Sequence, residues 1–394
     1  MKEQRRLAIL HYHLRPGGVT TVIRNAQRAL AGDFAVRLLT DLGYNERPAR
    51  SRAAFLHESR RIAEKLQRSL GDTTILHTHN LNLGKHPRLT LAVKMLAGRG
   101  RIQVINQVHD FAEENRPTQL HALRHCTGRL DERFWREICS YDLPNVLWTT
   151  LTTHDAGKLA ERGVPSNKIH VLPNPVDDEF LTGPKPSRGE LDTARKRIAA
   201  FAREHGYRFD ARRKILLSPM KVMVRKNNAE AVELVRRLNA TRGGGEFQLV
   251  ISLDASSPAD RRYSEALKRR IRREQLPVVI GAGSVVDLFT QFHLAHAVLT
   301  TSKVEGFGYA FVEGWLCGKL VFGRDIPTVT QDFVAEGMDF DHLYGEFNDG
   351  VIEPIARLLK RRPARLIARN RRIVLEKYSL RAYARRFAKL LRHL

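Results

Sequence analysis

A stretch between Thr300 and Gly323 gathers residue types that could bind and activate a charged ligand. It holds an acid, a glycine loop and a second acid eight positions after the first, reading Glu305-Gly306-Phe307-Gly308 and then Glu313. The apolar run Ala297–Leu299 predicts a buried strand before the loop. Apolar residues at helical spacing up to Gly318 predict a helix after it. The stretch is therefore expected to form a strand, a tight loop and a helix start.

This geometry limits the ligands that the loop could hold. Glycine lets the backbone approach a ligand where a Cβ atom would obstruct it. Free N–H groups and the positive end of a helix favour an anion. Glu305 stands at the mouth of the loop, and Glu313 could accept hydrogen bonds from vicinal hydroxyls. A phosphate site with two hydroxyl acceptors nearby suits a nucleotide sugar.

A basic segment follows the strand expected at Lys214–Leu217. It carries three cations before a helix that begins near Ala229, namely Lys221, Arg225 and Lys226. Cations at the carboxyl end of a strand, next to a helix start, would neutralise a diphosphate leaving group.

The first half of the chain alternates strand and helix patterns, which predicts a parallel sheet. Strands are expected at Leu7–His11, Phe34–Leu39, Thr74–His77, Gln103–Val108 and Leu147–Leu151. Gly17 and Gly18 follow the first of these, and His109 follows the fourth, at the edge where α/β proteins bind ligands. His77 and His79 alternate on one strand, but no acid or cysteine completes a metal set, so no metal site is predicted.

The order of these motifs resembles the retaining GT-B glycosyltransferases, in particular family 4, the glycogen synthase-like transferases of group 1. The resemblance covers almost the whole chain and implies an α/β fold with two Rossmann-like doubly wound domains facing a cleft. It also implies that a terminal helix crosses back to the first domain. The expected domains are 1–182 on the acceptor side, 183–377 on the nucleotide-sugar side, and the basic helix 378–394.

The resemblance also implies roles for the residues. Lys221 and Lys226 would bind the pyrophosphate, Arg225 would also bind the donor, and Glu313 would hold the ribose hydroxyls. Glu305 and the backbone from Gly306 to Tyr309, including Phe307 and Gly308, would hold the sugar. Gly17 and Gly18 would approach the acceptor or the phosphates of the donor, while His109 would touch both the donor sugar and the acceptor. His109, Glu305 and Lys226 are the expected catalytic residues. The family's usual arginine is absent, because Met220 and Lys221 occupy its candidate positions, and lysine offers a point charge instead of a bidentate fork.

The implied activity is transfer of a sugar from a UDP- or GDP-sugar to an acceptor hydroxyl with retention of configuration, without metal or cofactor. No carboxylate nucleophile is evident, so a same-face mechanism is expected. The acceptor stays open between a sugar, a lipid-linked glycan and a small metabolite. A nucleotide-sugar epimerase or a phosphorylase could share the fold, and a basic adaptor that binds a membrane or nucleic acid is the non-enzymatic alternative.

Composition sets further limits. A length of 394 residues predicts two domains, and 42% hydrophobic residues without a long apolar run predict no membrane span. No signal-peptide pattern is evident at the N-terminus. Three cysteines, which form no metal-ligand cluster, fit a reducing cytoplasm: Cys126, Cys139 and Cys317. The expected location is cytoplasmic.

The net charge of +25 is concentrated at one end. From Arg357 to Leu394 there are 14 Lys or Arg against one acid, Glu376. Such a segment could contact an anionic membrane surface at the inner face, or it could be the solvated face of helices. No nucleic-acid motif accompanies the charge, so nucleic acid is not an expected partner. A helix capped by Ser379 carries an apolar stripe through Tyr383 and Phe387 and is expected to pack on the first domain.

Overall fold

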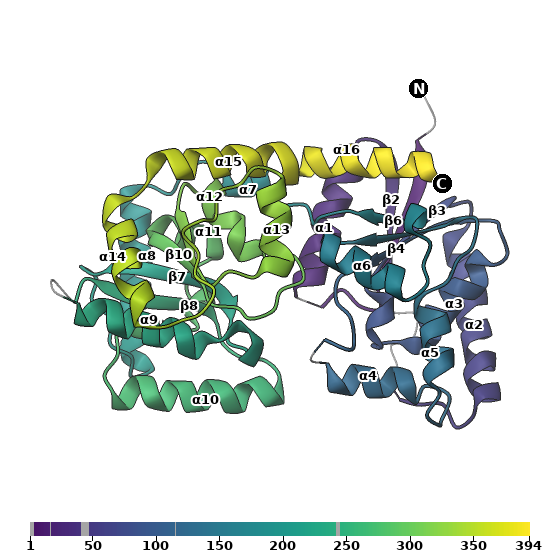
Figure 1. Ribbon diagram of the computed structural model, residues 1–394, viewed down its shortest axis with the longest axis horizontal. Coiled ribbons are helices and arrows are strands. Elements are labelled where there is room, and N and C mark those ends of the chain that lie inside the picture. The colour runs from purple at the N-terminus through teal and green to yellow at the C-terminus, as the bar shows by residue number, and fades with distance from the viewer. Residues whose placement is uncertain (1–3, 16, 41–46, 115, 242–244) are drawn as a thin grey trace. The chain divides into compact units, whose positions relative to one another are not determined.

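The computed structural model describes residues 4–15, 17–40, 47–114, 116–241 and 245–394. The chain forms two compact units (Figure 1). Unit 1 comprises Met1–Pro175 together with Tyr378–Leu394, and unit 2 comprises Val176–Lys377. Each unit contains one sheet of parallel strands, so the α/β fold class predicted from the sequence is confirmed.

The sheet of unit 1 has six strands in the order β2-β1-β3-β4-β5-β6. They are β1 (Arg5–Leu10), β2 (Phe34–Leu39), β3 (Ile75–His79), β4 (Gln103–Val108), β5 (Val146–Thr150) and β6 (Ile169–Val171). The helices of this unit before the crossing are α1 (Gly18–Leu30), α2 (Arg52–Leu70), α3 (Pro87–Ala97), α4 (Pro117–Arg124), α5 (Glu132–Cys139) and α6 (Thr153–Glu161). Every pair of neighbouring strands is parallel.

Apolar layers cover both faces of this sheet, and its inner strands β3, β4 and β5 are buried along almost their whole length, polar residues included. One layer joins alternate residues of the strands to α2 and α3, for example Leu76 to Leu66 and Leu89. The other layer joins the remaining strand residues to α1, as Ile75 does with Ile23. Strand order reverses between β1 and β3, because β2 follows β1 on one side and β4 follows β3 on the other. Ligands of open α/β sheets bind at such a switch point.

The helix α16 (Leu380–Leu390) belongs to unit 1 and packs against α1 (Figure 1). Ser379 caps it by accepting a hydrogen bond from the Ala382 backbone N–H at 3.2 Å. Its apolar stripe, including Tyr383 and Phe387, is buried in the same layer as Leu7 and Ile23. The terminal helix therefore crosses back as the resemblance implied, and its apolar stripe faces the protein core. Only its basic face is left for an anionic surface.

The sheet of unit 2 has five parallel strands in the order β11-β10-β7-β8-β9. They are β7 (Lys214–Lys221), β8 (Phe247–Leu253), β9 (Val278–Ile280), β10 (Ala295–Thr300) and β11 (Leu320–Gly323). The α-helices are α7 (Asp178–Leu181), α8 (Arg188–Glu204), α9 (Asn228–Ala240), α10 (Pro258–Arg273), α11 (Leu288–Leu294), α12 (Glu313–Leu316), α13 (Pro327–Ala335), α14 (Ile352–Arg361) and α15 (Ala364–Tyr378). Strand order reverses between β7 and β10, so this unit has its switch point there.

The units divide at residue 175, whereas the sequence placed the domain boundary after residue 182. Residues 176–182 lie in unit 2 because α7 packs against α12, where the Leu181 carbonyl accepts a hydrogen bond from the Cys317 thiol at 3.6 Å. Among the described residues, no helix is both long and apolar enough to cross a membrane.

Candidate active site

The basic segment and the glycine loop of unit 2 meet at the switch point between β7 and β10. Lys226 Nζ donates a hydrogen bond to Glu305 Oε1, and Arg225 Nη1 lies 3.5 Å from Glu305 Oε2. Arg225 also donates to the Val304 carbonyl at 3.1 Å. The Glu305 side chain is only 8% exposed. The structure thus brings together three of the residues predicted from the sequence.

Backbone contacts fix the two loops to each other. Thr301, just after β10, donates from its hydroxyl to the carbonyls of Lys226 and Asn227, each at 3.1 Å. The Lys303 N–H donates to the Arg225 carbonyl at 2.9 Å. Two ends of strands that are neighbours in the sheet but distant in the chain are thereby held in register.

Electrostatics keep Glu305 ionised. Burial by itself would raise the pKa of this carboxyl, but the charges of Lys226 and Arg225 outweigh burial and leave its pKa below the ordinary value. The site therefore combines one carboxylate with two cations. A charged group with two such partners can exchange one of them for a ligand without being left buried and unpaired.

Two residues not singled out by the sequence shape the basic segment. Asn227 adopts the left-handed conformation with φ 51°, and its side-chain amide donates to Glu230 Oε2 at 2.7 Å. Glu230, in the first turn of α9, also accepts from Arg324 at 2.6 and 3.1 Å and from the Tyr344 hydroxyl at 3.0 Å. The only sequence signal was an acid next to an Asn-Asn pair, because Arg324 and Tyr344 come from distant loops.

The glycine loop needs its second glycine. Gly308 has φ 82°, and a Cβ atom there would lie 2.7 Å from Phe311 Cδ2 and 3.2 Å from Val329 Cγ1. Phe307 is buried and packs edge-on against Tyr309, with ring centroids 5.1 Å apart. The loop is thus held by aromatic packing on both sides of the glycine.

The single helix expected after this loop is a misprediction. A 3-10 turn at Tyr309–Phe311 comes first, and α12 then spans only four residues from Glu313. Val312, with φ −121°, lies between the 3-10 turn and α12 and separates them. Aligned peptide dipoles sum along a helix, so a one-turn helix contributes little to anion binding. Electrostatic attraction at this site must come from Arg225 and Lys226 instead.

Glu313 begins α12 and is partly buried. Burial, followed by the nearby charge of Asp177, raises the pKa of its carboxyl to about 8. Within the described part of the chain its carboxyl has no hydrogen-bond partner. It is therefore an acceptor available to a ligand that brings its own donors.

Lys221 takes a different direction from the other cations. Its Nζ donates to Ser256 Oγ at 2.9 Å, beyond the end of β8, and it is not part of the Glu305 cluster. Met220, by contrast, is buried, and its sulfur accepts a hydrogen bond from the Ser302 hydroxyl at 3.4 Å. Of the two positions that replace the expected arginine, only Lys221 offers a charge at this edge.

In unit 1, His109 is held at the switch point by Asn80. The Asn80 side-chain oxygen accepts from the backbone N–H groups of His109 and Asp110 at 3.3 and 3.2 Å. Asn80 is buried and has φ 57°. His109 Nε2 lies 2.9 Å from His79 Nδ1. Asn80 and His79 were missed as partners of His109, since only strand register aligns them.

Gly17 and Gly18 lie at the start of α1. Gly17 is extended, and an added Cβ atom would meet nothing closer than the Arg15 carbonyl at 4.0 Å. At Gly18 nothing lies within 4 Å. Neither position requires glycine for the fold, so their predicted role toward a ligand stays a prediction.

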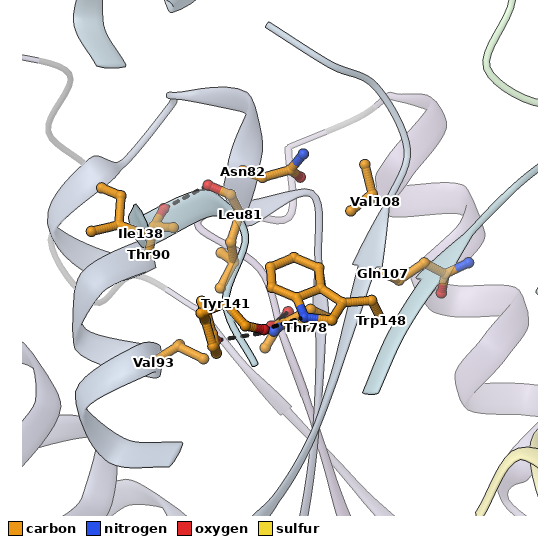
Figure 2. A pocket seen from close by; sticks show the side chains of 11 residues that line it. Thr78, Leu81, Asn82, Thr90, Val93, Gln107, Val108, Ile138, Tyr141 and Trp148 are labelled. Atoms are coloured by element: carbon orange, nitrogen blue, oxygen red, sulfur yellow. Dashed lines mark hydrogen bonds between the residues drawn. The ribbon is translucent and has the colours of Figure 1, made fainter. Parts of the chain in front are cut away.

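A polar cavity on the other face of the sheet in unit 1 is too small for a substrate. It occupies about 10 Å³ and is lined by Thr78, Tyr141 and Trp148, among others (Figure 2). A space of this size admits about one water molecule. Asn106 connects its walls, accepting from the Thr78 hydroxyl at 2.9 Å and donating to the Tyr141 hydroxyl at 3.0 Å. This network stabilises the sheet beneath the switch point.

One group in the described residues has metal-ligand geometry, formed by Glu114, His154 and Asp155 within 4.8 Å of one another. Lys158 pairs with both acids, its Nζ lying 3.3 Å from Asp155 Oδ1. An ammonium group thus already neutralises these carboxylates. His77 and His79, considered as metal ligands from the sequence, make hydrogen bonds to Gln107 and His109 instead.

No protein-family model matches the chain. A curated relative is mannosylglucosyl-3-phosphoglycerate synthase of Petrotoga mobilis, 27% identical over an alignment of 360 residues that covers 83% of this chain. The match spans 66% of that relative, slightly less than two thirds of its length.

Solved structures of similar fold include Anabaena HepE in complex with UDP-glucose, with a TM-score of 0.68, 13% identity and coverage of 99% of this chain and 100% of HepE. A glycosyltransferase from Rickettsia africae gives a TM-score of 0.72 at 13% identity, covering 98% and 97% of the two chains. Trehalose-6-phosphate synthase OtsA gives a TM-score of 0.66 at 13% identity, with 99% of each chain covered. At these identities the likeness establishes the fold alone. The chain has the GT-B fold that its motifs predicted.

Proposed function

We propose that this protein is a glycosyltransferase that moves a sugar from a nucleotide-sugar donor, a UDP- or GDP-sugar, to an acceptor hydroxyl. The observation that carries this proposal is the Glu305 cluster, in which a buried carboxylate and two cations meet beside a glycine loop at a switch point. The names of the relative and of the similar structures support it, since HepE is bound to UDP-glucose.

Each group has a distinct task in the proposed site. One of the two cations, Lys226 or Arg225, turns from Glu305 toward the pyrophosphate of the donor and stabilises the charge that develops on it, while the other stays paired with Glu305. Glu305 then accepts hydrogen bonds from the sugar hydroxyls, with the backbone of Phe307–Tyr309 beside it. Glu313 accepts from the ribose hydroxyls, because its carboxyl has no partner in the described residues. Lys221 contributes a further charge at the same sheet edge.

The proposed reaction retains the anomeric configuration, as in family 4. The bond between the anomeric carbon and the phosphate oxygen breaks, and the acceptor oxygen bonds to the same face of the sugar. The acceptor proton passes to the leaving phosphate oxygen. Two lysine or arginine charges supply the neutralisation that a divalent ion supplies elsewhere, so neither a metal nor a cofactor enters the proposal. Trapping of a covalent glycosyl-enzyme would contradict this mechanism.

The name of the relative supports a proposal for the class of acceptor. Its name describes a product built on 3-phosphoglycerate. We extend to this chain only the chemistry, a small hydroxylated acceptor that carries anionic groups. A net charge of +25 favours the approach of such an acceptor.

Thermal unfolding with a panel of UDP-, GDP- and ADP-sugars tests the function. A bound donor raises the melting temperature by mass action, so a selective rise identifies the donor class. Glu313→Ala, which removes the acceptor oxygens, should abolish the rise, whereas Glu353→Ala, at an exposed position of α14, should leave it unchanged. If no nucleotide sugar raises the melting temperature, the proposed function is wrong.

A further inference from the structure

The histidines at the switch point of unit 1 form a buried hydrogen-bonded group. His79 Nδ1 and His109 Nε2 are 2.9 Å apart, and the exposed fractions of the two residues are 0% and 4%. His77 Nε2 lies 2.9 Å from Gln107 Oε1, and His11 Nδ1 lies 2.7 Å from the His79 carbonyl. Two imidazole nitrogens that face each other must share one proton between them, one as donor and one as acceptor. The nitrogen that carries the shared proton determines whether the other ring nitrogen of His109 donates or accepts a hydrogen bond.

The tautomer of His77 is set by its neighbour. The Gln107 side-chain N–H group donates to the Leu172 carbonyl at 3.1 Å, which turns the amide oxygen toward His77. His77 must therefore carry its proton on Nε2. Its Nδ1 is buried without a partner in the described residues, and it is the nitrogen without a proton.

The same reasoning applies to His79. Its Nε2 is buried, also without a partner among the described residues. A buried N–H group left unpaired loses its hydrogen bond to water without compensation, and orphaned N–H groups are rarer in native proteins than unpaired acceptors. The favoured tautomer leaves Nε2 bare and places the proton on Nδ1. His79 then donates to His109 Nε2, and the proton of His109 resides on its own Nδ1.

We propose that His79 is a positioning residue that fixes His109 as a neutral hydrogen-bond donor, presenting Nδ1–H to an oxygen of the ligand. The ligand part of this inference rests on the proposed function and specifies it: His109 binds a sugar or acceptor oxygen as a donor. His109 cannot serve as a general base, because the lone pair of Nε2 is already used by His79.

The surroundings keep the pair neutral. Burial lowers the pKa of His109 to about 3, the Asp110 carboxylate raises it in part, and His11 and His77 lower it further. Asp110 is itself paired with Arg116 at 2.7 Å. Together with His79, these are the titratable and charged groups that act on His109 in the described part of unit 1, and they come from β3 and from the segments after β1 and β4. Protonation of His109 would place two N–H groups against each other, so uptake of a proton requires the His79 ring to move.

The primary test is the tautomer itself, read from imidazole nitrogen shifts of the full chain labelled with ¹⁵N-histidine. His109 signals are assigned from their loss in His109→Gln. The expected result is a bare Nε2 and a protonated Nδ1 on His109, unchanged between pH 5.5 and 8.5. A proton on Nε2 of His109 in the wild-type protein would overturn the proposal.

Variants of His79 test its positioning role. His79→Leu removes the donor, so the proton of His109 should no longer be confined to Nδ1 and the Nε2–H tautomer should appear, while burial still keeps the ring neutral. His79→Asn keeps an N–H donor where Nδ1 stood and should restore the wild-type tautomer. His77→Leu removes an equally buried imidazole from the same strand and should leave the tautomer of His109 unchanged.

Turnover gives an independent readout. With His79→Leu, kcat should fall about 10- to 100-fold while the donor KM stays within about twofold, because the group is misdirected but the donor site is intact. His79→Asn should recover most of the loss. Equal losses in His79→Leu and His77→Leu would mean that His79 matters only for packing and would refute the positioning role. Absence of any donor binding, with the Nδ1–H tautomer present, would refute the proposed function and leave the His79–His109 assignment standing.

Discussion

The ionisation of Glu313 should make the stability of the protein depend on pH in a way that one substitution removes. Glu313 is partly buried at the start of α12, and its carboxyl has no hydrogen-bond partner in the described part of the chain. Burial and the charge of Asp177 hold its pKa near 8, whereas an unperturbed glutamate titrates near 4.5. The folded protein therefore binds this proton more tightly than the unfolded chain does.

The sign and the size of this pH dependence follow from the difference in proton binding between the folded and the unfolded protein. A raised pKa in the folded state means that stability is complete below about pH 4.5, falls as pH rises, and levels off above about pH 8. The loss reaches about 2 kcal/mol at pH 6 and about 5 kcal/mol at pH 9, as an upper limit set by that pKa. Glu313→Gln removes the titration and keeps the shape of the side chain.

The assay is unfolding of the wild-type and Glu313→Gln proteins at pH 6 and pH 9. The variant should gain up to about 3 kcal/mol relative to wild type between these values, whatever the constant effect of the amide on packing. Glu353→Gln, at an exposed site, should show no such change with pH. A difference between Glu313→Gln and wild type that stays the same at both pH values would refute the reasoning.

Three further results follow from the site. Glu305→Gln should lower stability by about 2 kcal/mol and strongly reduce turnover, since it leaves two cations facing a neutral amide; unchanged donor turnover would exclude Glu305 from the site. Gly323→Ala should prevent folding of unit 2, because Gly323 has φ 134° and a Cβ atom there would lie 1.9 Å from the Thr300 carbonyl oxygen. Gly318→Ala has open space around the new Cβ atom and should lower stability by only about 1–2 kcal/mol through strain of the left-handed backbone. Circular dichroism and thermal melting compare the two variants, and a well-folded Gly323→Ala protein would contradict the expectation. Treatment with EDTA should leave turnover unchanged, and a loss restored by Mg²⁺ or Mn²⁺ would overturn the metal-independent proposal.

The sequence predicted strands of the first sheet well, both the inner strand β4, which is buried except at Gln103, and the edge strand β2, which is exposed at Ala35 and Arg37. The bounds of β2 and β4 agree with the apolar runs Phe34–Leu39 and Gln103–Val108. The sequence patterns did not reveal α8, because charged residues dominate this part of the chain. The buried stripe of α8 consists of Ala194, Ile198 and Ala202, which is too narrow and too weakly apolar to stand out among the charges. The capping box at Ser187 and Glu190 was the signal that could have revealed it.

The components of the candidate site were predictable, but their pairing was not. Glu305 and Lys226 are separated by 79 positions and meet only because β10 lies beside β7. His79 and His109 meet because β3 and β4 pair in a particular register, which sets His79 opposite Gln107. Strand order and register arise from packing of the whole sheet, so they cannot be deduced from the local patterns of a single amino-acid sequence. Short-range motifs identify reactive residues, and topology selects their partners.

The placement of α16 has a consequence for how the chain is made. The core around β1 and α1 is completed by Tyr383 and Phe387, residues that are synthesised after all of unit 2. Unit 2 is contiguous and can assemble as soon as it leaves the ribosome, while unit 1 must wait with an uncovered apolar layer beside Ile23 and Leu30. The half of the chain that is synthesised first is therefore the half that is completed last, and its apolar layer stays exposed until α16 has been synthesised.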